Sequence, residues 1–220
     1  MQLAEGTRHW FPQFCRQTPW ELNNTYDGLG SSLIQKYSGG RNTPRNAPIL
    51  RAAAQGKSAF GSPGQVTDFT QVLLRGLRGA GAKEEGNTDH WFVPYTGLLH
   101  ALHVLLENDP PAGVRRQEFR WGGDASEVNL THLRNPPRVT VQIDCLPPDT
   151  AQYATLKLSS QLCNFTRSRQ PSVGPWRERD VPVDYAYQLA AKYDNGRYPA
   201  SALNVSVLPP LQRLHVPVTP

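Results

Sequence analysis

The sequence lacks the features that carry a protein into or across a membrane. It contains no run of about 18 apolar residues, so we expect no membrane-spanning helix. The start, MQLAEGTRHW, has no basic segment followed by an apolar one, and we therefore expect no secretory signal. A protein outside the secretory route is not glycosylated, so the Asn-x-Ser/Thr sites are expected to be chance matches. These absences predict a cytoplasmic protein with no membrane partner.

Cysteine is also scarce, with only Cys15, Cys145 and Cys163 at wide spacing. Three such residues do not form a disulfide framework, and none has the close Cys or His neighbours of a zinc site. Free thiols in a reducing compartment are expected, with no cofactor. His100, His103 and Glu107 follow at helical spacing, but an exposed helix face is favoured there over a metal site. We therefore predict no metal ligands.

Positive charge exceeds negative charge only modestly, at a formal net charge of +5. The arginines are scattered along the chain, whereas a nucleic-acid surface usually has a clustered basic stripe with interleaved aromatic residues. An ordinary solvated surface is the favoured interpretation. No nucleic-acid partner is expected.

The first half of the chain mixes short apolar runs with two helical patterns. Residues 47–60 begin as a short buried strand, and Thr67 or Asp68 is placed to cap a helix. Apolar residues then recur at helical spacing up to Gly79, where the helix is expected to end. A strand-like triplet at 91–93 precedes a leucine-rich helix that stops before the prolines after Asp109.

The second half changes to short alternating segments separated by turn residues. Alternation with a period of two residues predicts an antiparallel β-sandwich. Cys145 points the same way as its apolar neighbours and is expected in the core, whereas Cys163 has no chemical partner by sequence. Tyr185 and Tyr187 are expected to share one face. The main alternating segments are 127–133, 138–145, 153–160, 181–193 and 203–208.

The two halves predict two domains with a linker between them. Residues 114–126 are polar, basic and rich in glycine, as inter-domain segments commonly are. We place an α/β region at 1–113, a linker at 114–127 and the β-sandwich at 128–220.

The helix at the centre of the first half carries a family resemblance. The run SAFGSPGQVTDFTQVLLRGLRG resembles the C-terminal part of the caspase-like peptidase domain of bacterial caspase-family and metacaspase-like proteins. The resemblance covers about residues 8–107. It implies a partial caspase-like three-layer α/β sheet that lacks its N-terminal strands, followed by an appended, immunoglobulin-like β-sandwich. The residues that match the family's FT-x-x-LL-x-x-L-x-G helix are Phe69, Thr70, Leu73, Leu74, Leu77 and Gly79.

The resemblance assigns the nucleophile of a cysteine endopeptidase to Cys15. The aromatic run HWFPQFC ends at this residue, where the family has its nucleophile strand. A thiolate there attacks a peptide carbonyl to form an acyl-enzyme, a histidine shares its proton, and backbone N–H groups hold the oxyanion. The alternative for Cys15 is a small buried hydrophobic residue, which is the role of most free cysteines.

Five further positions are candidates for contact with a peptide substrate. Gln13 and Arg16 flank the nucleophile, and Arg16 could shape the pocket mouth, although solvation in a loop is favoured for it. Ser58, Phe60 and Gly61 fall where the family's second substrate-facing strand runs, so backbone pairing with an extended substrate is plausible there. Core packing is the alternative for Phe60.

The chain departs from the family pattern in two respects. Gln13 stands where the family has an acid, and Pro12 interrupts the strand before it. Gln13 cannot supply the negative charge that would recognise a basic substrate residue. The family's catalytic histidine belongs to a His-Gly pair, and the chain contains no such pair. His9 lies six residues before Cys15, about 20 Å away along an extended strand. A catalytic Cys15 therefore needs a histidine from another chain, which would also complete the sheet.

Two hypotheses follow from the sequence. In the first, the chain is a fragment or degenerate form of a caspase-family cysteine endopeptidase that acts on a peptide or protein substrate through Cys15. In the second, it is a non-catalytic interaction or scaffold protein that uses the β-sandwich as a binding module. The missing histidine, Gln13 and Pro12 favour the second hypothesis.

Overall fold

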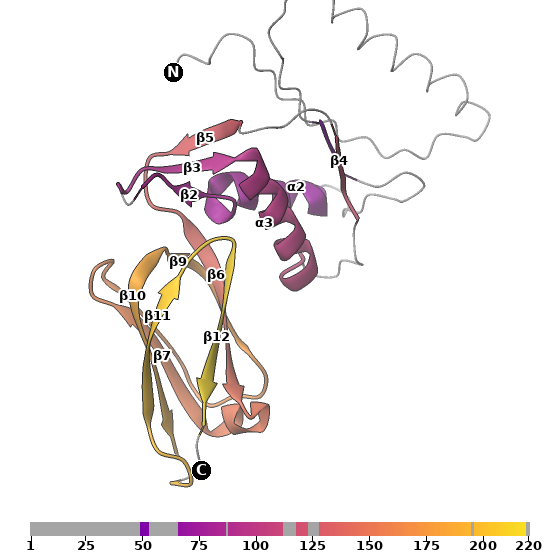
Figure 1. Ribbon diagram of the computed structural model, residues 1–220. Helices are drawn as coiled ribbons and strands as arrows, with labels where there is room; N and C mark the ends of the chain where they lie inside the picture. The colour runs from indigo at the N-terminus through magenta and orange to yellow at the C-terminus, as the bar shows by residue number, and fades with distance from the viewer. Residues whose placement is uncertain are drawn as a thin grey trace, which may run out of the picture. The chain divides into compact units, whose positions relative to one another are not determined.

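The computed structural model describes residues 49–52, 66–86, 88–111, 118–122, 128–194 and 196–218 (Figure 1). These residues separate into two compact units. The described residues up to Gln71 and from Pro110 to Val128 form the first unit, and those of 72–109 and 129–218 form the second. This division differs from the sequence-based one, because residues 72–109, which include most of both helical segments, share a unit with the second-half strands. The linker expected at 114–127 stays a prediction.

The first unit is small in the described part of the chain. Strand β1 (Ile49–Arg51) pairs antiparallel with β4 (Arg120–Gly122). The helix α2 (Asp68–Arg75) begins in this unit, and the backbone N–H of Thr70 donates to the Thr67 hydroxyl oxygen at 3.3 Å. Thr67 is therefore the N-cap, one of the two candidates that the sequence offers.

The second unit starts with the end of that helix. α2 continues into one π-helical turn, η2 (Gly76–Ala80), in which Gly79 has a φ of 146°. Only glycine adopts such a backbone conformation readily, so the expected helix end at Gly79 is confirmed. β2 (Lys83–Glu84) and β3 (Trp91–Pro94) follow, and α3 (Tyr95–Asn108) then forms the predicted leucine-rich helix.

A three-stranded antiparallel sheet, ordered β2-β3-β5, accompanies these helices. β5 (Asn129–Leu133) pairs with β3, whereas its alternating pattern assigned it to the sandwich. Period-two alternation identifies a strand but not its partner, which explains this difference. All strand pairs in this sheet are antiparallel, so the described residues show no caspase-like α/β layer. That layer stays a prediction.

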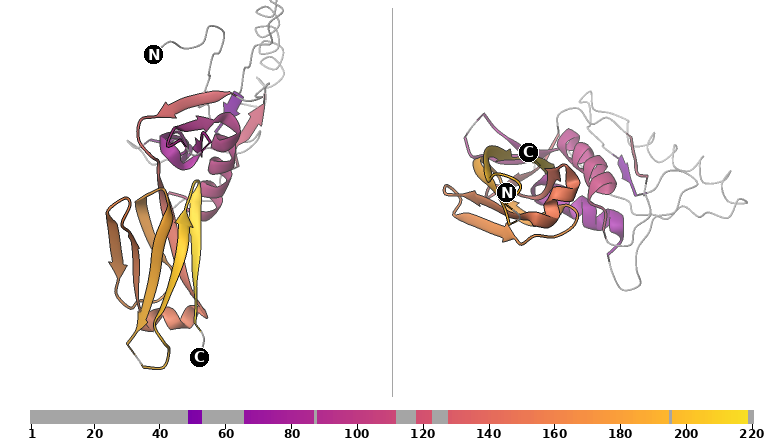
Figure 2. Two further views of the ribbon diagram at one scale, coloured as in Figure 1. Left: turned by 60° about the vertical axis from the view of Figure 1, so that its left-hand side comes forward. Right: turned by 90° about the horizontal axis from the view of Figure 1, so that it is seen from below.

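The rest of the second unit is the predicted β-sandwich. One sheet has the order β11-β10-β7-β8 and the other the order β12-β6-β9, and Figures 1 and 2 show them facing each other. The protein is therefore mostly β-structure with few helices in the residues described. The strands of the first sheet are β7 (Ala154–Ser160), β8 (Phe165–Arg169), β10 (Asp184–Tyr193) and β11 (Ser201–Val207). Those of the second are β6 (Arg138–Leu146), β9 (Trp176–Pro182) and β12 (Leu211–Pro217), and the 3₁₀-helix η3 (Pro148–Tyr153) leads from β6 to β7.

The sandwich core is built from the inward-facing residues of both sheets. Ile143 and Cys145 of β6 are buried, which confirms the core position expected for Cys145. They belong to the same core as Leu158 of β7 and Leu189 of β10. Burial of these apolar side chains is the main stabilising contribution of such a domain.

The strand order is not that of an immunoglobulin domain. With the seven strands lettered A to G along the chain, the sheets read F-E-B-C and G-A-D, whereas immunoglobulin sheets read A-B-E-D and C-F-G. In addition, β12 lies parallel to β6 along its whole length. The predicted sandwich is thus present, but its strands are connected differently from the immunoglobulin pattern.

Tyr185 is turned out of the core by a bulge in β10. The pairing shifts by one residue between Asp184 and Tyr187, so three steps along β10 match two steps along β11. A bulge reverses the alternation locally. Tyr187 is consequently buried while Tyr185 is exposed. The Tyr185 hydroxyl donates to Glu84 Oε2 at 2.9 Å. The expectation that both tyrosines share one face is wrong for this reason.

A buried carboxylate joins the end of α3 to the sandwich. Asp109 is 1% exposed, and its Oδ2 forms an ion pair with Arg75, whose guanidinium also donates to the Thr140 hydroxyl at 3.2 Å. The Oδ1 atom of Asp109 lies 3.6 Å from Arg177 and 3.9 Å from Arg179 of β9. Three guanidinium groups thus surround one carboxylate, and together they tie α2, α3, β6 and β9 into one unit.

In the part of the chain that the structure describes, no helix is both long enough and apolar enough to span a membrane.

Candidate functional site

The site residues expected from the sequence cannot be placed by this structure. All six candidates for the peptidase centre lie outside the described residues: Gln13, Cys15, Arg16, Ser58, Phe60 and Gly61. Their roles stay predictions. The histidine-bearing face of α3 is described, and there His100, His103 and Glu107 are all exposed. Within the described ranges no group of three His, Cys, Asp or Glu side chains is arranged to hold a metal ion.

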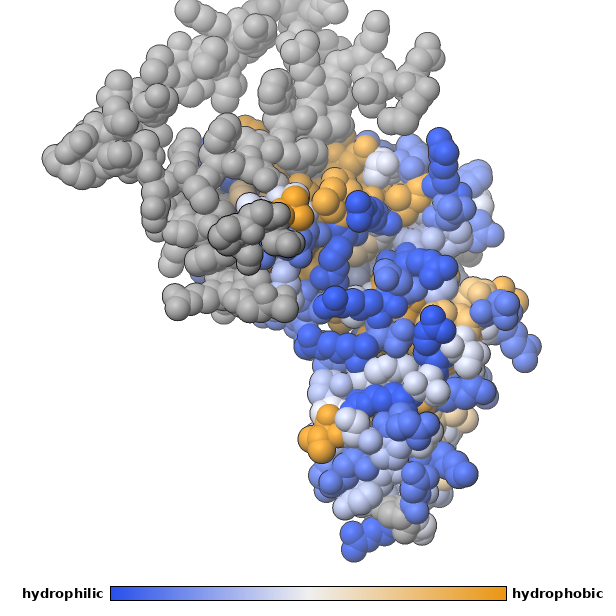
Figure 3. Space-filling view, turned by 180° about the vertical axis from the view of Figure 1, so that it is seen from behind, coloured by the Kyte–Doolittle hydropathy of each residue, from blue (hydrophilic) through white to orange (hydrophobic). Residues whose placement is uncertain are grey.

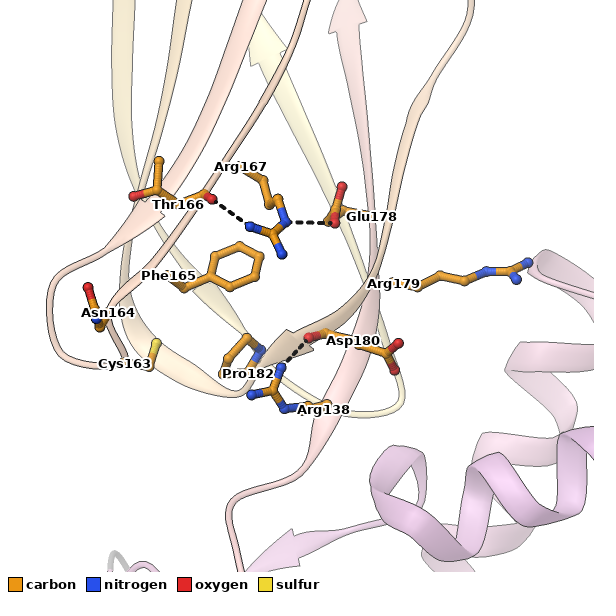
Figure 4. Close-up of a pocket in the computed structure, with 10 residues that line it drawn as sticks. All are labelled: Arg138, Cys163, Asn164, Phe165, Thr166, Arg167, Glu178, Arg179, Asp180 and Pro182. Atoms are coloured by element: carbon orange, nitrogen blue, oxygen red, sulfur yellow. Dashed lines mark hydrogen bonds and ion pairs between the residues drawn. The ribbon is translucent and has the colours of Figure 1, made fainter.

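The described sandwich has a cleft on its open side, between the edge strands β8 and β9. Among the described strands each of them pairs with one neighbour only, β8 with β7 and β9 with β6. The space between them has a volume of about 460 Å³, and Figure 4 shows the side chains around it. The residues that line it are Arg138, Cys163, Asn164, Phe165, Thr166, Arg167, Glu178, Arg179, Asp180 and Pro182.

Alternation along β8 puts an aromatic ring and a cation into the cleft. Phe165 is 8% exposed and meets Tyr187 edge-on, with the ring centroids 5.9 Å apart. Arg167, two residues further along, lies on the same side of the strand, and its guanidinium carbon is 5.4 Å from the Phe165 centroid. This distance is within the range of a cation–π contact. The ring therefore forms an apolar floor with a positive charge beside it.

A second bulge shapes the β9 side of the cleft. Val139 pairs with Val181 and Val141 with Glu178, so β9 carries one extra residue in this stretch. Asp180 adopts a φ of 57° there. Figure 4 shows the Asp180 carboxylate and the Arg179 side chain pointing away from the Phe165 ring. Bulges commonly re-aim side chains at edge strands, and this one leaves Glu178 as the carboxylate nearest to Arg167.

The cleft has a surplus of positive charge around Phe165. In Figure 4 Arg167 lies beside the ring, and Arg138 lies beyond Pro182 in the same cleft. Arg138 donates to the backbone carbonyl of Asp180 at 3.0 Å, and within the described residues it forms no ion pair. Arg167 lies 3.5 Å from Glu178 Oε1. Strong charge-assisted hydrogen bonds are shorter than this, and the Arg167 side chain is 60% exposed, so the pair is weak. Both guanidiniums therefore retain donor capacity.

Cys163 has chemical partners at the end of the cleft, contrary to the expectation from sequence. Its Sγ lies 3.4 Å from Asp184 Oδ2 and 3.3 Å from the Tyr187 hydroxyl. The Tyr187 hydroxyl also donates to the Pro182 carbonyl at 2.8 Å, and burial raises the pKa of this tyrosine above its usual value. The partners come from β10, about twenty residues away in the chain, which is why a local reading of the sequence did not find them.

Asp184 is held in its ionised form by the donors around it. Burial alone would raise the pKa of this carboxyl group, but hydrogen bonds from the Ser160 hydroxyl at 2.5 Å and the Ala186 N–H at 3.1 Å outweigh burial. The pKa of Asp184 is therefore below its ordinary value of 3.8. The carboxylate anchors the turn that carries Cys163 into the cleft.

Replacing Ser160 by alanine should show how its hydrogen bond to the Asp184 carboxylate contributes to the pH dependence of stability. We expect a loss of about 1 kcal/mol of unfolding free energy near pH 7, because a hydrogen bond to a partly exposed carboxylate disappears. A lowered folded-state pKa contributes stability above the unfolded pKa, and this contribution is lost as the pH falls through the folded pKa. The difference between Ser160→Ala and wild type should therefore shrink as the pH falls through the lowered folded-state pKa of Asp184 in urea titrations. Ser168→Ala, an exposed position on β8, is the control; a pH-independent loss in Ser160→Ala would contradict the assignment.

The sandwich face seen in Figure 3 shows few apolar groups. In Figure 3 the sandwich face is mostly hydrophilic, and the hydrophobic groups on it stand apart from one another. Two strongly exposed apolar residues are Leu162 and Val173, at 79% and 83% exposure. Leu162 lies in the turn before β8 and Val173 in the loop after it, so both flank the strand that forms one wall of the cleft.

The comparisons with known proteins give little functional information. No protein-family model matches the chain. One relative is the uncharacterized protein y4kE of Sinorhizobium fredii (strain NBRC 101917 / NGR234), which is 27% identical over 150 residues. The match covers 67% of this chain and 43% of y4kE, so the chain spans less than half the length of that protein. This distant similarity does not assign the chain to a family.

Proposed function

We propose that the β-sandwich is a binding module that recognises a polypeptide segment bearing carboxylate groups, and that the β8–β9 cleft is its binding site. The observation that carries the proposal is the pair of guanidinium groups, Arg138 and Arg167, that line the cleft together with the Phe165 ring. Arginine binds carboxylates through paired N–H donors, and an aromatic floor lowers the competition from water. The proposal develops the interaction-module hypothesis from the sequence by assigning binding to the β8–β9 cleft.

Main-chain geometry supports an extended polypeptide as the ligand. β8 and β9 are sheet edges, and edge strands offer unpaired N–H and C=O groups to an added strand. A segment lying along β8 would reach Leu162 at one end and Val173 at the other. Exposed apolar residues at both ends provide contacts for side chains of the segment. The carboxylate contact would fix its position between them.

The peptidase hypothesis stays a prediction beside this proposal. Cys15, its proposed nucleophile, and the expected substrate contacts lie outside the described residues. Hydrolysis would in addition require a histidine in place near Cys15. The binding proposal does not depend on Cys15 and can be tested in a Cys15→Ser variant.

A pair of matched peptides tests the proposal. A fluorescent glutamate-rich peptide should bind the full chain, and its glutamine counterpart of equal length should bind at least about tenfold more weakly, because it lacks charge-assisted hydrogen bonds. Arg138→Gln and Arg167→Gln should each weaken binding of the glutamate-rich peptide by about tenfold in anisotropy titrations.

The net positive charge of the protein could by itself attract an acidic peptide. A variant that removes a positive charge outside the cleft is therefore the control. Lys157→Gln removes one positive charge from an exposed position on β7 and should leave the affinity within about twofold. Equal binding of both peptides, or an equal loss in Lys157→Gln, would contradict the assignment to the cleft. Absence of binding to any peptide would overturn the proposed function itself.

Thiol protection gives an independent location for the bound peptide. Cys163 lines the cleft, whereas Cys145 is buried in the core. In a Cys15→Ser background, the glutamate-rich peptide should slow alkylation of Cys163 while Cys145 stays unreactive. Unchanged alkylation of Cys163 under saturating peptide would place the peptide elsewhere.

A further inference from the structure

The four edge strands of the sandwich differ in how they discourage pairing with other strands. Exposed sheet edges are usually protected by charged side chains, bulges or proline. β8 carries Arg167 and Arg169, and the latter donates to the carbonyls of Val173 and Gly174. β9 carries four consecutive charged residues and the bulge at Asp180. β12 carries Arg213, which donates to Asn108 of α3.

β11 carries none of these protections on its own residues, since the bulge in its pairing adds a residue to β10. Its sequence, SALNVSV, contains no charged residue, no proline and no glycine. It lies at the end of its sheet and pairs only with β10 among the described strands. An edge without charge or proline leaves its unpaired N–H and C=O groups open to a further strand. The edge of β11 is therefore the sandwich edge best suited to adding one.

The side chains of β11 alternate in a way that matches a second copy of the same strand. Leu203 and Val205 pair with Leu189 and Tyr187 of β10, so they share the inward face and are only partly buried there. Asn204 points outward, is exposed, and pairs with Gln188. Partly exposed apolar side chains on an inward face are what an additional strand would cover.

We propose that two copies of the chain associate through antiparallel pairing of β11 with β11, on a two-fold axis through Asn204. In this register Leu203 of one copy lies opposite Val205 of the other, and Ala202 lies opposite Ser206. Asn204 meets the Asn204 side chain of the second copy, where the two amides can hydrogen-bond. Apolar residues thus face apolar ones and polar residues face polar ones, with no like charges opposed. The two four-stranded sheets become one continuous sheet.

A dimer of this kind is isologous, so a residue on the two-fold axis contacts the same residue of the second copy. A substitution at Asn204 therefore introduces two identical side chains that lie opposite one another. Asn204→Lys and Asn204→Glu each place two like charges directly opposite one another. Each variant should weaken self-association about fivefold in sedimentation experiments over about 10 to 500 µM, given two unit charges a few ångströms apart in water. An equal mixture of the two variants should associate at least as well as wild type, because the opposed charges now attract.

Gln188→Lys is the matched control. It adds the same charge on the same outward face, one strand further from the edge, so the two lysines would be about 14 Å apart and largely screened. It should leave association within about twofold of wild type. In a background without Cys15 and Cys163, Asn204→Cys should cross-link on mild oxidation, because antiparallel neighbours across an axis meet disulfide geometry, whereas Gln188→Cys should not.

Three outcomes would overturn the proposal. A chain that stays monomeric over the whole concentration range excludes a second copy as the occupant of β11. A dimer that is insensitive to Asn204→Lys places the contact on another surface. A mixture of Asn204→Lys and Asn204→Glu that associates no better than either variant alone excludes the two-fold axis through this residue. None of these outcomes bears on peptide binding in the β8–β9 cleft.

Discussion

Replacing Phe165 by alanine is expected to lower the unfolding free energy of the sandwich by about 3 kcal/mol. The ring is 8% exposed and packs edge-on against Tyr187, so its removal leaves a cavity between the two sheets. The loss of contact with the Arg167 guanidinium adds a smaller contribution. Urea denaturation followed by circular dichroism would measure the change.

A second variant at this position separates folding from binding. Phe165→Leu keeps most of the apolar volume and should cost only about 1 kcal/mol, but it removes the aromatic face from beside Arg167. This variant should fold and bind the glutamate-rich peptide several-fold more weakly. Tyr153→Ala, at a more exposed aromatic position, should change stability by less than about 1 kcal/mol. A Phe165→Ala variant as stable as Tyr153→Ala would contradict the description of the ring as the cleft floor.

Replacing Asp109 by alanine is expected to destabilise the second unit by about 2 to 3 kcal/mol. The buried carboxylate is the shared partner of Arg75, Arg177 and Arg179, and its loss removes the carboxylate that these three neighbouring cations share. The figure is below that of a fully buried pair because all three guanidiniums reach solvent. Calorimetric unfolding near neutral pH would measure it.

The control for this prediction is a carboxylate with no such surroundings. Asp194 is exposed, and Asp194→Ala should change stability by less than about 0.5 kcal/mol. Asp109→Asn retains the shape and hydrogen-bonding capacity but not the charge, so an intermediate loss is expected from it. If Asp109→Ala unfolds at the same temperature as Asp194→Ala, the carboxylate does not hold α3 to the sandwich.

The alternation of β6 and β7 could be predicted from the sequence, whereas β8 and β9, with charged inward residues, could not. RVTVQIDC and YATLKLSS place apolar residues at every second position, and both are strands, β6 and β7. In β8 the inward positions after Phe165 are arginines, and in β9 one inward position is Glu178. Their alternation in hydrophobicity is therefore broken, and no strand was expected in either segment.

These missed strands are the ones that form the candidate site. A strand at a sheet edge tolerates charged inward residues because they reach solvent through the open side of the sandwich. The same charges that hide the strand pattern provide the guanidinium groups of the cleft. The signal that could have indicated them is the spacing of Phe165 and Arg167 after the turn at Cys163, two residues apart on one face.

Bulges set the second limit on prediction. Tyr185 was expected beside Tyr187, and Asp180 had no expected direction, because an added residue in a strand leaves no signature in the period itself. The third limit on prediction is contact between residues that are distant in sequence, such as Cys163 and Asp184, because a local pattern does not indicate it. The expected peptidase residues around Cys15 are a different case, since the structure describes none of them.

The most direct test of the central claim is a double-mutant cycle between Arg167 and the peptide carboxylates. The affinity of wild type and Arg167→Gln would be measured for the glutamate-rich peptide and for its glutamine counterpart. If the guanidinium binds a carboxylate, each change alone weakens binding about tenfold, and both together weaken it hardly more than one. If the two losses multiply instead, Arg167 and the carboxylates act independently, and the β8–β9 cleft is not the site that recognises them.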